Sequence, residues 1–182
     1  MGSNNDISLK ALAKINLGLD VVRRREDGYH EVRMIMQTIQ LYDRLDIKRT
    51  QEPGIQIQTN LSFLPVNENN LIYKAAKLLM DEFSITDGVS VKLDKRIPVA
   101  AGMAGGSTDA AAMLIGVNRL FSLGLTKRQL MERGVQIGAD VPYCIMRGTA
   151  LAEGIGEALS PLPPMVKCPV LIAKPSISVS TK

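Results

Sequence analysis

The sequence has 182 residues, of which 46% are hydrophobic, 22% charged and 4% aromatic. This composition is typical of a globular chain with its own hydrophobic core, and it excludes a disordered or fibrous protein. The formal net charge of +4 is spread over 22 basic and 18 acidic residues without a long basic block, so it favours an anionic ligand only weakly.

The first segment has the pattern of a long β-strand. Apolar residues alternate strictly from Ile7 to Leu19, which predicts a strand with one buried face. Lys10, Lys14 and Asn16 then share the opposite face.

More strands are expected before the first helix. The turn signal at 27–28 and the strand formers at 32–41 predict a hairpin-like return of the chain. Residues 43–48 and 54–59 are predicted to form further short strands. We therefore expect the first sixty residues to be predominantly β.

The middle of the chain changes to a helical period. Residues 67–84 place apolar side chains on one stripe and charged side chains on the other, which predicts an amphipathic helix. A short strand is expected at 89–93, followed by a glycine-rich stretch at 97–107 and an alanine-rich helix at 108–121.

A further helix has a clear start signal at Thr126. Thr126 and Gln129 have capping-box spacing, and Leu125 and Leu130 occupy the positions of a hydrophobic staple. This helix is predicted to end near Gly138 as its C-terminal cap.

The last segments are predicted to be strands at 144–152 and 170–173, separated by the proline-rich residues 160–164. Strands and helices are mixed without a regular βαβα alternation, which favours an α+β fold over a doubly wound sheet. We expect residues 1–182 to form one continuous domain.

The cysteines and the N-terminus indicate the cellular location. Cys144 and Cys168 lie in apolar surroundings without CxxC spacing, so we expect reduced, buried thiols rather than a zinc site or a disulfide. No apolar run reaches the ~18–20 residues that span a bilayer, and residues 1–6 do not resemble a signal peptide. We expect a cytoplasmic protein without a membrane partner.

The strongest local signal is the glycine-rich loop from Pro98 to Asp109, which leads directly into a helix. Glycines let backbone N–H groups approach phosphate oxygens, and the unpaired N–H groups at the helix start face the same place. The loop lacks the lysine of a GxxxxGK[ST] motif and does not fit G-x-G-x-x-G. On these residues alone a phosphate cradle and a tight packing turn both stay open, with Ser107 and Thr108 as simple helix caps in the second case.

Two other segments combine with this loop. They are Ala-Lys-Ile-Asn-Leu at 13–17 and Gly-Ala-Asp-Val-Pro-Tyr at 138–143, and an Arg-x-Asp-Gly-Tyr-His-Glu turn lies at 25–31. Together with the loop they resemble the GHMP kinase family over essentially the whole chain. The resemblance implies an N-terminal, ATP-binding GHMP domain of the ribosomal protein S5 domain 2 type, a mixed β-sheet with helices packed on it.

The resemblance also implies a reaction. It is transfer of the γ-phosphoryl group of ATP, with Mg²⁺, to the 2-hydroxyl of 4-diphosphocytidyl-2-C-methyl-D-erythritol in the non-mevalonate isoprenoid pathway. Asp140 matches the family's catalytic base and Lys14 its partner lysine, whose ammonium would stabilise charge on Asp140 and on the transferred group. Taken singly, Lys14 is an ordinary solvated lysine and Asp140 an ordinary loop acid.

The binding residues follow from the same resemblance. The ATP-binding loop comprises Pro98, Val99, Ala100, Ala101, Gly102, Met103, Ala104, Gly105, Gly106, Ser107 and Thr108. Ser107 is also the candidate metal ligand. The substrate contacts are assigned to Asn16, Tyr29, His30 and Thr181, with Tyr29 and His30 stacking on and hydrogen-bonding the cytosine. Without the motif, His30 is a surface turn residue and Asn16 a structural cross-strand amide.

Members of the family continue beyond Thr181 with a second domain, so we expect the C-terminal domain to be absent from this chain. We therefore expect weak or no turnover, and an exposed apolar interdomain face that favours a homodimer.

Two alternatives remain at this point. Another GHMP kinase could act on a mevalonate-like or homoserine-like alcohol, but such substrates lack a base to stack on Tyr29. A nonenzymatic RNA-binding module of the same fold is disfavoured by the low aromatic content and the lack of a basic stripe. We expect a small-molecule substrate and no nucleic-acid partner.

Overall fold

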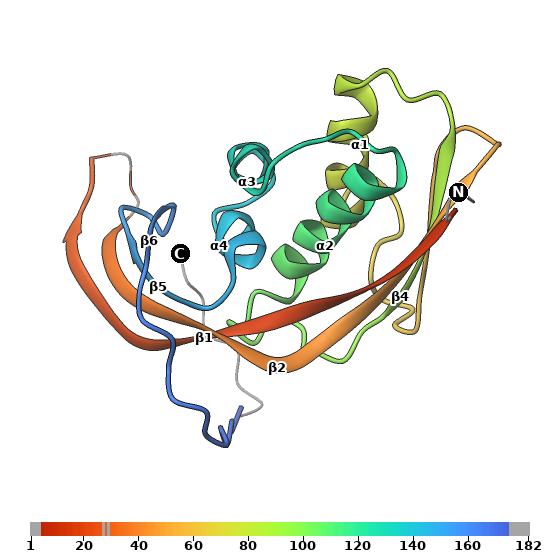
Figure 1. Ribbon diagram of the computed structural model, residues 1–182. Coiled ribbons are helices and arrows are strands. Elements are labelled where there is room, and N and C mark those ends of the chain that lie inside the picture. Colours follow the sequence, from red (N-terminus) through yellow and green to blue (C-terminus); the bar gives the residue numbers. More distant parts are fainter. Residues whose placement is uncertain (1–4, 27, 29, 175–182) are drawn as a thin grey trace.

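The computed structural model describes residues 5–26, 28 and 30–174 of the chain as a single mixed β-sheet with four helices on one of its faces (Figure 1). The strands are β1 (Asp6–Arg24), β2 (His30–Thr50), β3 (Ile55–Thr59), β4 (Gly88–Asp94), β5 (Thr149–Glu153) and β6 (Ala158–Pro161). The helices are α1 (Leu71–Glu82), α2 (Gly105–Leu120), α3 (Lys127–Gly134) and α4 (Val141–Met146). The predicted α+β class is confirmed.

The long strand β2 organises the sheet. The order is β3-β4-β2-β5-β6, and β1 pairs with β2 outside this path. Only β3 and β4 run parallel, and the other pairs are antiparallel. The predicted hairpin return is therefore confirmed, and the two strands expected at 32–41 and 43–48 are one continuous strand.

The predicted alternation along β1 holds only for its first half. Ala11 and Ala13 are fully buried, but Leu17 and Leu19 are 47% and 51% exposed, while Lys14 is only 6% exposed. The pairing register of β1 with β2 shifts between residues 12 and 14 and again between 16 and 18. A bulge of this kind changes the face to which later side chains point, so the single buried face expected up to Leu19 was wrong.

The outer edge of β1 is closed by the loop and the helix that follow β4. Among the described residues β1 has no strand partner other than β2. On its other side the Thr108 hydroxyl donates to the Leu12 carbonyl at 2.8 Å, and the Lys14 N–H donates to the Met103 carbonyl at 3.2 Å. The glycine-rich loop is thereby fixed against the middle of β1.

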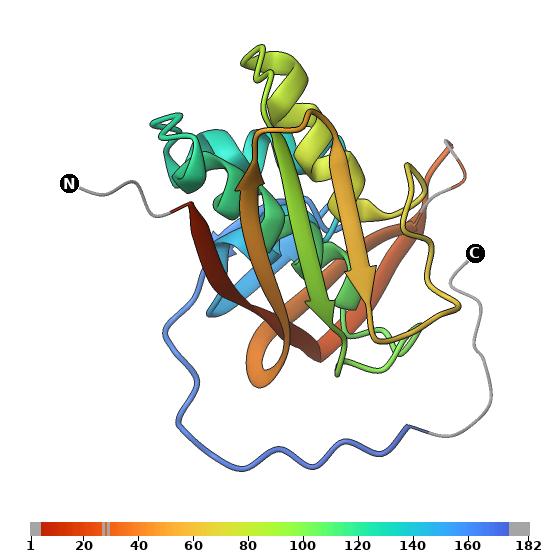
Figure 2. The ribbon, with the colours of Figure 1, turned by 90° about the vertical axis from the view of Figure 1, so that its right-hand side faces the viewer.

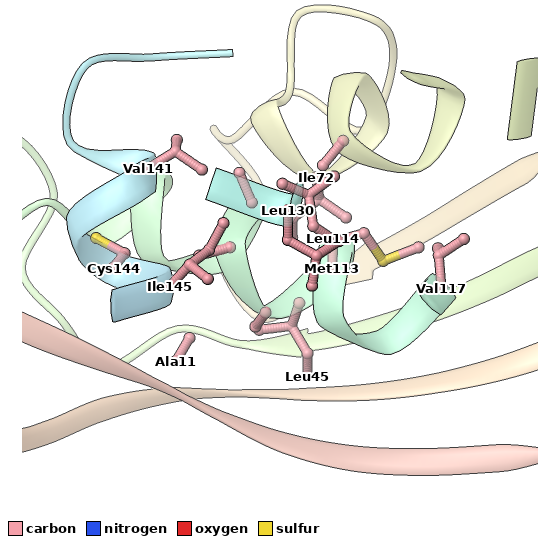
Figure 3. Close-up of a cluster of buried hydrophobic side chains, with 14 of the residues drawn as sticks. Ala11, Leu45, Ile72, Met113, Leu114, Val117, Leu130, Val141, Cys144 and Ile145 are labelled. Atoms are coloured by element: carbon pink, nitrogen blue, oxygen red, sulfur yellow. The ribbon is translucent and has the colours of Figure 1, made fainter. Parts of the chain in front are cut away.

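The core lies between the helices and the sheet (Figure 3). Its largest fully buried side chain is Tyr143 of α4, and the others from α1, α2, β2 and β4 include Ile72, Leu79, Met113, Leu114, Val117, Leu45, Ile47, Val89 and Val91. Helix α2 approaches the sheet closely at Gly116, where a Cβ atom would lie 2.3 Å from Cδ1 of Ile47. Burial of apolar area at ~25 cal/mol per Å² makes this layer the main source of stability.

Helix α3 begins where the sequence predicts. The Thr126 side chain accepts a hydrogen bond from the Gln129 N–H, and Oε1 of Gln129 accepts one from the Thr126 N–H at 2.9 Å, so the capping box is present. Leu125 and Leu130 both pack in the main core cluster. The helix ends at Gly134 rather than near Gly138, because Gly134 packs so tightly that a Cβ would lie 2.9 Å from Val141.

We expect Thr126→Ala to lower the free energy of unfolding by about 1 kcal/mol, because the Gln129 N–H loses its acceptor. Urea denaturation followed by circular dichroism measures this difference. Thr86→Ala is the matched control, since Thr86 is exposed and lies outside any helix or strand; it should stay within about 0.5 kcal/mol. Equal effects of the two substitutions would show that the capping box contributes nothing.

The predicted strand at 144–152 was wrong in its first half. Residues Val141–Met146 form the short helix α4, and only Thr149–Glu153 are a strand. Pro142 lies in the first turn of α4, where its missing N–H and fixed φ favour a helix start. A short apolar run cannot be assigned to helix or strand by its period alone.

The C-terminal segment also differs from expectation. Residues 170–173 form no strand, and Leu171 is 98% exposed. Residues 162–174 run as an extended segment along the outside of the domain (Figure 2). Cys168 lies in this segment and is exposed, so the expectation of a buried thiol was wrong there, whereas Cys144 is buried. Burial raises the pKa of the Cys144 thiol to about 12.

Within the described part of the chain, no helix is long and apolar enough to cross a membrane.

Candidate active site

A cavity of about 580 Å³ opens beside the glycine-rich loop. Its walls come from the middle of β1, the loop at 98–104, the first turns of α2, Asp140 before α4, and residues 64–71 before α1. The volume lies within the range of ligand sites in proteins, ~300–1,000 Å³. Segments far apart in the sequence therefore meet around one space that can hold a small molecule.

The loop has the backbone geometry of an anion cradle. Ala100, Gly102 and Ala104 have φ values of 54°, 71° and 55°, so left-handed residues recur at every second position. Such alternation turns successive N–H groups toward one side and forms a concave nest for an anion. Two of these residues are alanines, for which the left-handed region costs ~1–2 kcal/mol. The strain is a mark of a functional loop rather than of a simple packing turn.

The N–H groups of this loop are not used by the protein. Among the described residues, no backbone N–H from 99 to 107 donates to a protein acceptor. Helix α2 starts after Ala104 without a side-chain cap, and the Thr108 hydroxyl bonds to β1 instead. Ser107 and Thr108 are therefore not helix caps. The free N–H groups and the positive end of the α2 dipole are available to an anionic ligand.

Lys14 and Asp140 meet in the cavity, as the motif predicts for the catalytic pair. Nζ of Lys14 lies 3.8 Å from Oδ2 of Asp140, and the two side chains are 7% and 33% exposed. Nζ of Lys14 also donates to Oδ1 of Asn16 at 3.2 Å. At 3.8 Å the ion pair is longer than a hydrogen bond, so a polar group of a ligand can contact both side chains.

The local structure leaves the Asp140 carboxylate free. Asp140 is the N-cap residue of α4, but its backbone is in the helical region (φ −82°, ψ −13°) and its side chain accepts no capping bond from the described residues. An N-cap aspartate normally has an extended backbone and accepts an N–H of the first turn. Here the carboxylate is directed to the cavity, and Ser107 lies on the same wall.

A buried charge cluster behind the loop was not found from the sequence. Nζ of Lys95 bonds to Asp43 at 2.5 Å and to Asp109 at 2.7 Å, and all three side chains are at most 5% exposed. The other oxygen of Asp43 accepts the N–H groups of Arg96 and Ile97. Two carboxylates thus share one ammonium group directly beneath the start of α2.

This cluster is joined to the ligand cavity. Lys95 and Asp109 both line the cavity, and a Cβ on Gly105 would lie 2.9 Å from Nζ of Lys95. Burial raises the pKa of Asp109 to about 8, although the charge of Lys95 opposes this shift. Oδ1 of Asp109 is buried and has no partner among the described residues. The glycine at 105 is required because the ammonium group lies against the loop.

The cavity's remaining wall is held by asparagines. Asn70 caps α1 by accepting the Ile72 N–H at 2.9 Å and donates to the Pro65 carbonyl at 2.7 Å. Asn60 makes two hydrogen bonds with the backbone of Lys95, at 3.1 and 2.8 Å. These amides fix residues 64–71 opposite the glycine-rich loop.

The structure places the remaining predicted site residues as follows. Asn16 lines the cavity with Lys14. His30 is exposed at the start of β2 and does not line this cavity. Tyr29 and Thr181 lie outside the described residues, so the predicted substrate contacts there stay predictions. No group of three His, Cys, Asp or Glu side chains that could hold a metal occurs in the described ranges.

Comparison with known proteins gives consistent matches. Residues 70–148 match the model of the GHMP kinase N-terminal domain. The 4-diphosphocytidyl-2-C-methyl-D-erythritol kinase of Lachnoclostridium phytofermentans is 64% identical over 176 residues, which are 97% of this chain and 60% of that protein. The Clostridium perfringens protein of the same name is 53% identical, over 97% of this chain and 61% of its own length. The chain thus spans about 60% of the length of these relatives.

Solved structures agree with these matches. A crystal structure of 4-(cytidine 5'-diphospho)-2C-methyl-D-erythritol kinase superposes with a TM-score of 0.76 and 38% identity, covering 86% of this chain and 55% of that one. Homoserine kinase from Cytophaga hutchinsonii superposes with a TM-score of 0.69 over 90% of this chain and 53% of its own, at 16% identity. The second likeness shows the fold alone.

Proposed function

Because this chain belongs to the GHMP kinase family, we propose that it is the ATP-binding part of a kinase that phosphorylates the 2-hydroxyl of 4-diphosphocytidyl-2-C-methyl-D-erythritol. The observation that supports this most is the meeting of Lys14 and Asp140 in the cavity beside a loop of unused N–H groups. The relatives and the solved structure that carry this name are 64%, 53% and 38% identical.

The chemistry of the proposed reaction fits these two side chains. An alcohol is a poor nucleophile, and the Asp140 carboxylate can take its proton as the oxygen forms a bond to the γ-phosphorus of ATP. The bond between that phosphorus and the β–γ bridging oxygen breaks, and ADP leaves. The Lys14 ammonium stabilises the negative charge that develops on the acceptor oxygen and the transferred group.

The loop is proposed to hold the triphosphate. Its unused N–H groups would donate hydrogen bonds to the phosphate oxygens, and the start of α2 adds its dipole. Mg²⁺ in kinases is held mainly by the phosphates and one or two protein oxygens. Ser107, which lines the cavity, fits that role, and the ion would neutralise charge on the phosphates.

The acceptor is proposed to lie toward β1. Asn16 would contact it from its place beside Lys14, and Tyr29, His30 and Thr181 would bind its cytidine part. We propose that residues 1–182 form the N-terminal, ATP-binding domain, and that the part of the relatives' length which this chain does not span completes the cleft. A cytoplasmic location and a homodimer are part of the same proposal.

We expect this chain to bind ATP–Mg²⁺ in isothermal titration calorimetry and Gly105→Val to abolish that binding. A side chain at 105 would press on Lys95, whose Nζ is 2.9 Å from the position of a Cβ atom, and would fill the cradle. Gly18→Val is the matched control, because Gly18, like Gly105, has no positive φ, and a Cβ atom there would meet no other atom within 4 Å. Circular dichroism should show a cooperative unfolding transition for both variants, which establishes that each is folded.

The substrate can be tested separately on the same chain. Cytidine diphosphate should bind, and mevalonate and homoserine should not. Binding of ATP–Mg²⁺ to Gly105→Val as tightly as to the unmodified chain would contradict the loop assignment. Equal binding of mevalonate and cytidine diphosphate would contradict the assignment of the acceptor.

A further inference from the structure

A second pocket, of about 460 Å³, lies at the other end of α2. It is bounded by the start of β1, the second half of α2, α3 and the end of α4. It shares no lining residue with the cavity beside the glycine-rich loop. Any ligand of this pocket is therefore separate from the proposed ATP site, and the inference does not depend on the proposed function.

The rim of this pocket is cationic. Arg119, Lys127 and Arg147 line it, and its lining contains no aspartate or glutamate. None of the three forms an ion pair with a carboxylate of the described residues. Several other surface cations do have a carboxylate partner, as Arg133 has Glu82. The three cations are thus an uncompensated cluster.

Few of the donors on this rim are used. Arg147 donates one hydrogen bond to the Lys10 carbonyl at 3.0 Å, and Lys127 donates one to the Met146 carbonyl at 2.5 Å. Arg119 has no side-chain hydrogen bond within the part of the chain that the structure describes. A guanidinium has five N–H donors and an ammonium three. Most donors of the cluster therefore remain available to an anion.

The backbone of Arg147 has a strained conformation. Its backbone has φ 62° and ψ 176°, a region in which residues other than glycine are strained and which is concentrated at ligand sites. Partial burial lowers the pKa of its guanidinium, and the positive charge of Arg119 lowers it further. A bound anion would compensate both the desolvation and the repulsion.

The floor of the pocket is apolar. Leu9 and Ile115 are partly exposed in it, and beneath them lie the buried side chains of Ala112, Leu130 and Ile145. Leu130 and Ile145 belong to the main core cluster, where both are labelled in Figure 3. An inorganic ion would leave this floor uncovered, whereas a hydrocarbon chain would cover it.

We propose that this pocket binds an amphiphilic phosphate, with its phosphate on Arg119, Lys127 and Arg147 and its hydrocarbon part on Leu9 and Ile115. The cationic rim fixes the head group, and bidentate contacts from the two arginines suit a phosphate. The apolar floor adds affinity in proportion to the methylene groups that it covers. The ligand class is therefore set by both halves of the pocket.

Hexyl phosphate is a suitable probe, added to the ¹⁵N-labelled chain while amide resonances are followed by NMR. We expect saturable shifts at the amides of 115–119, 127 and 147, and binding about tenfold tighter than that of inorganic phosphate, because each buried methylene contributes ~0.8 kcal/mol. Hexanol should not saturate the pocket. Shifts confined to residues 98–107, or equal affinities for hexyl phosphate and inorganic phosphate, would overturn the proposal.

Matched variants locate the site. Arg119→Gln and Arg147→Gln should each weaken hexyl phosphate about tenfold through loss of charge-assisted hydrogen bonds. Arg119 makes no contact that folding requires, so this variant stays informative if Arg147→Gln unfolds. Arg128→Gln is the control, since Arg128 lies on α3 with a side chain 91% exposed and paired to Glu132. Equal affinity of Arg119→Gln and the unmodified chain would overturn the proposal, as would an equal loss in Arg128→Gln. Gly105→Val should leave this binding unchanged.

Discussion

Lys95→Met is expected to lower the free energy of unfolding by about 3–5 kcal/mol, because it leaves the buried carboxyl groups of Asp43 and Asp109 without the cation that they share. Nζ of Lys95 contacts Asp43 and Asp109, whose side chains are 0% and 4% exposed. Domains of this kind are stable by only ~5–15 kcal/mol. Urea denaturation at neutral pH measures the loss.

The same variant should become strongly pH-dependent. Burial raises the pKa of Asp109 from 3.8 to about 8, and Lys95 is what opposes this shift. A carboxyl whose folded pKa lies above its unfolded value binds its proton more tightly in the native state, so stability is full at low pH and is lost as pH rises through the folded pKa. We therefore expect the unmodified chain to lose stability between about pH 4 and pH 8, and Lys95→Met, which lacks the opposing charge, to go on losing stability above pH 8.

Two further variants make this result specific. The control Lys92→Met changes an exposed lysine on β4, three residues before Lys95, and should change stability by less than about 0.5 kcal/mol. The double variant Lys95→Met with Asp109→Asn should recover part of the loss, because one buried charge is removed. If Lys95→Met cost no more than Lys92→Met, the cluster would have no structural role.

Asp140→Asn is expected to slow phosphoryl transfer by about 10²–10⁴-fold, the usual contribution of a general base. The change keeps the size of the side chain and removes the group that takes the proton. Single-turnover transfer from radiolabelled ATP to 4-diphosphocytidyl-2-C-methyl-D-erythritol, with the chain in excess over ATP, detects even slow reaction. The binding of ATP–Mg²⁺ should change far less than the rate.

Asn69→Asp is the control for an exchange between carboxylate and amide in the cavity wall, because Asn69 also lines the cavity, in the segment before α1. It should keep the rate within a few-fold. A rate for Asp140→Asn equal to that of the unmodified chain would refute Asp140 as the base. No transfer by the unmodified chain would mean that the second domain is required.

Much of the architecture follows from local patterns. The amphipathic period of residues 67–84 and the capping box at Thr126 predict α1 and the start of α3, because both signals lie within one helix. The run from 141 to 146 is too short and too apolar for its period to separate helix from strand. Its identity depends on Pro142 and on the contact of Gly134 with Val141, which only the fold provides.

The candidate site, too, could be predicted from the sequence only in part. Lys14, Asp140 and the loop were predicted from their motifs, and the structure brings them into one cavity, although their roles stay predictions. One sequence pattern indicates the buried cluster of Asp43, Lys95 and Asp109. Asp43 falls between Leu41 and Leu45 in an alternating strand, so a charge stands at an inward position. Lys95 directly follows β4 and continues the inward series of Val91 and Leu93, but the pairing of Asp43 with Lys95 depends on β2 lying beside β4.

The closed edge of β1 links solubility to catalysis. An unpaired strand edge recruits other strands and leads to aggregation unless it is covered. In this chain the edge of β1 is covered by two groups. The Thr108 hydroxyl donates to the Leu12 carbonyl, and the Met103 carbonyl accepts the N–H of Lys14. Substitutions that loosen the glycine-rich loop therefore uncover the edge as well. The same few contacts thus serve both the site and the protection of the strand edge. Fewer loop sequences are therefore tolerated than either requirement alone would allow.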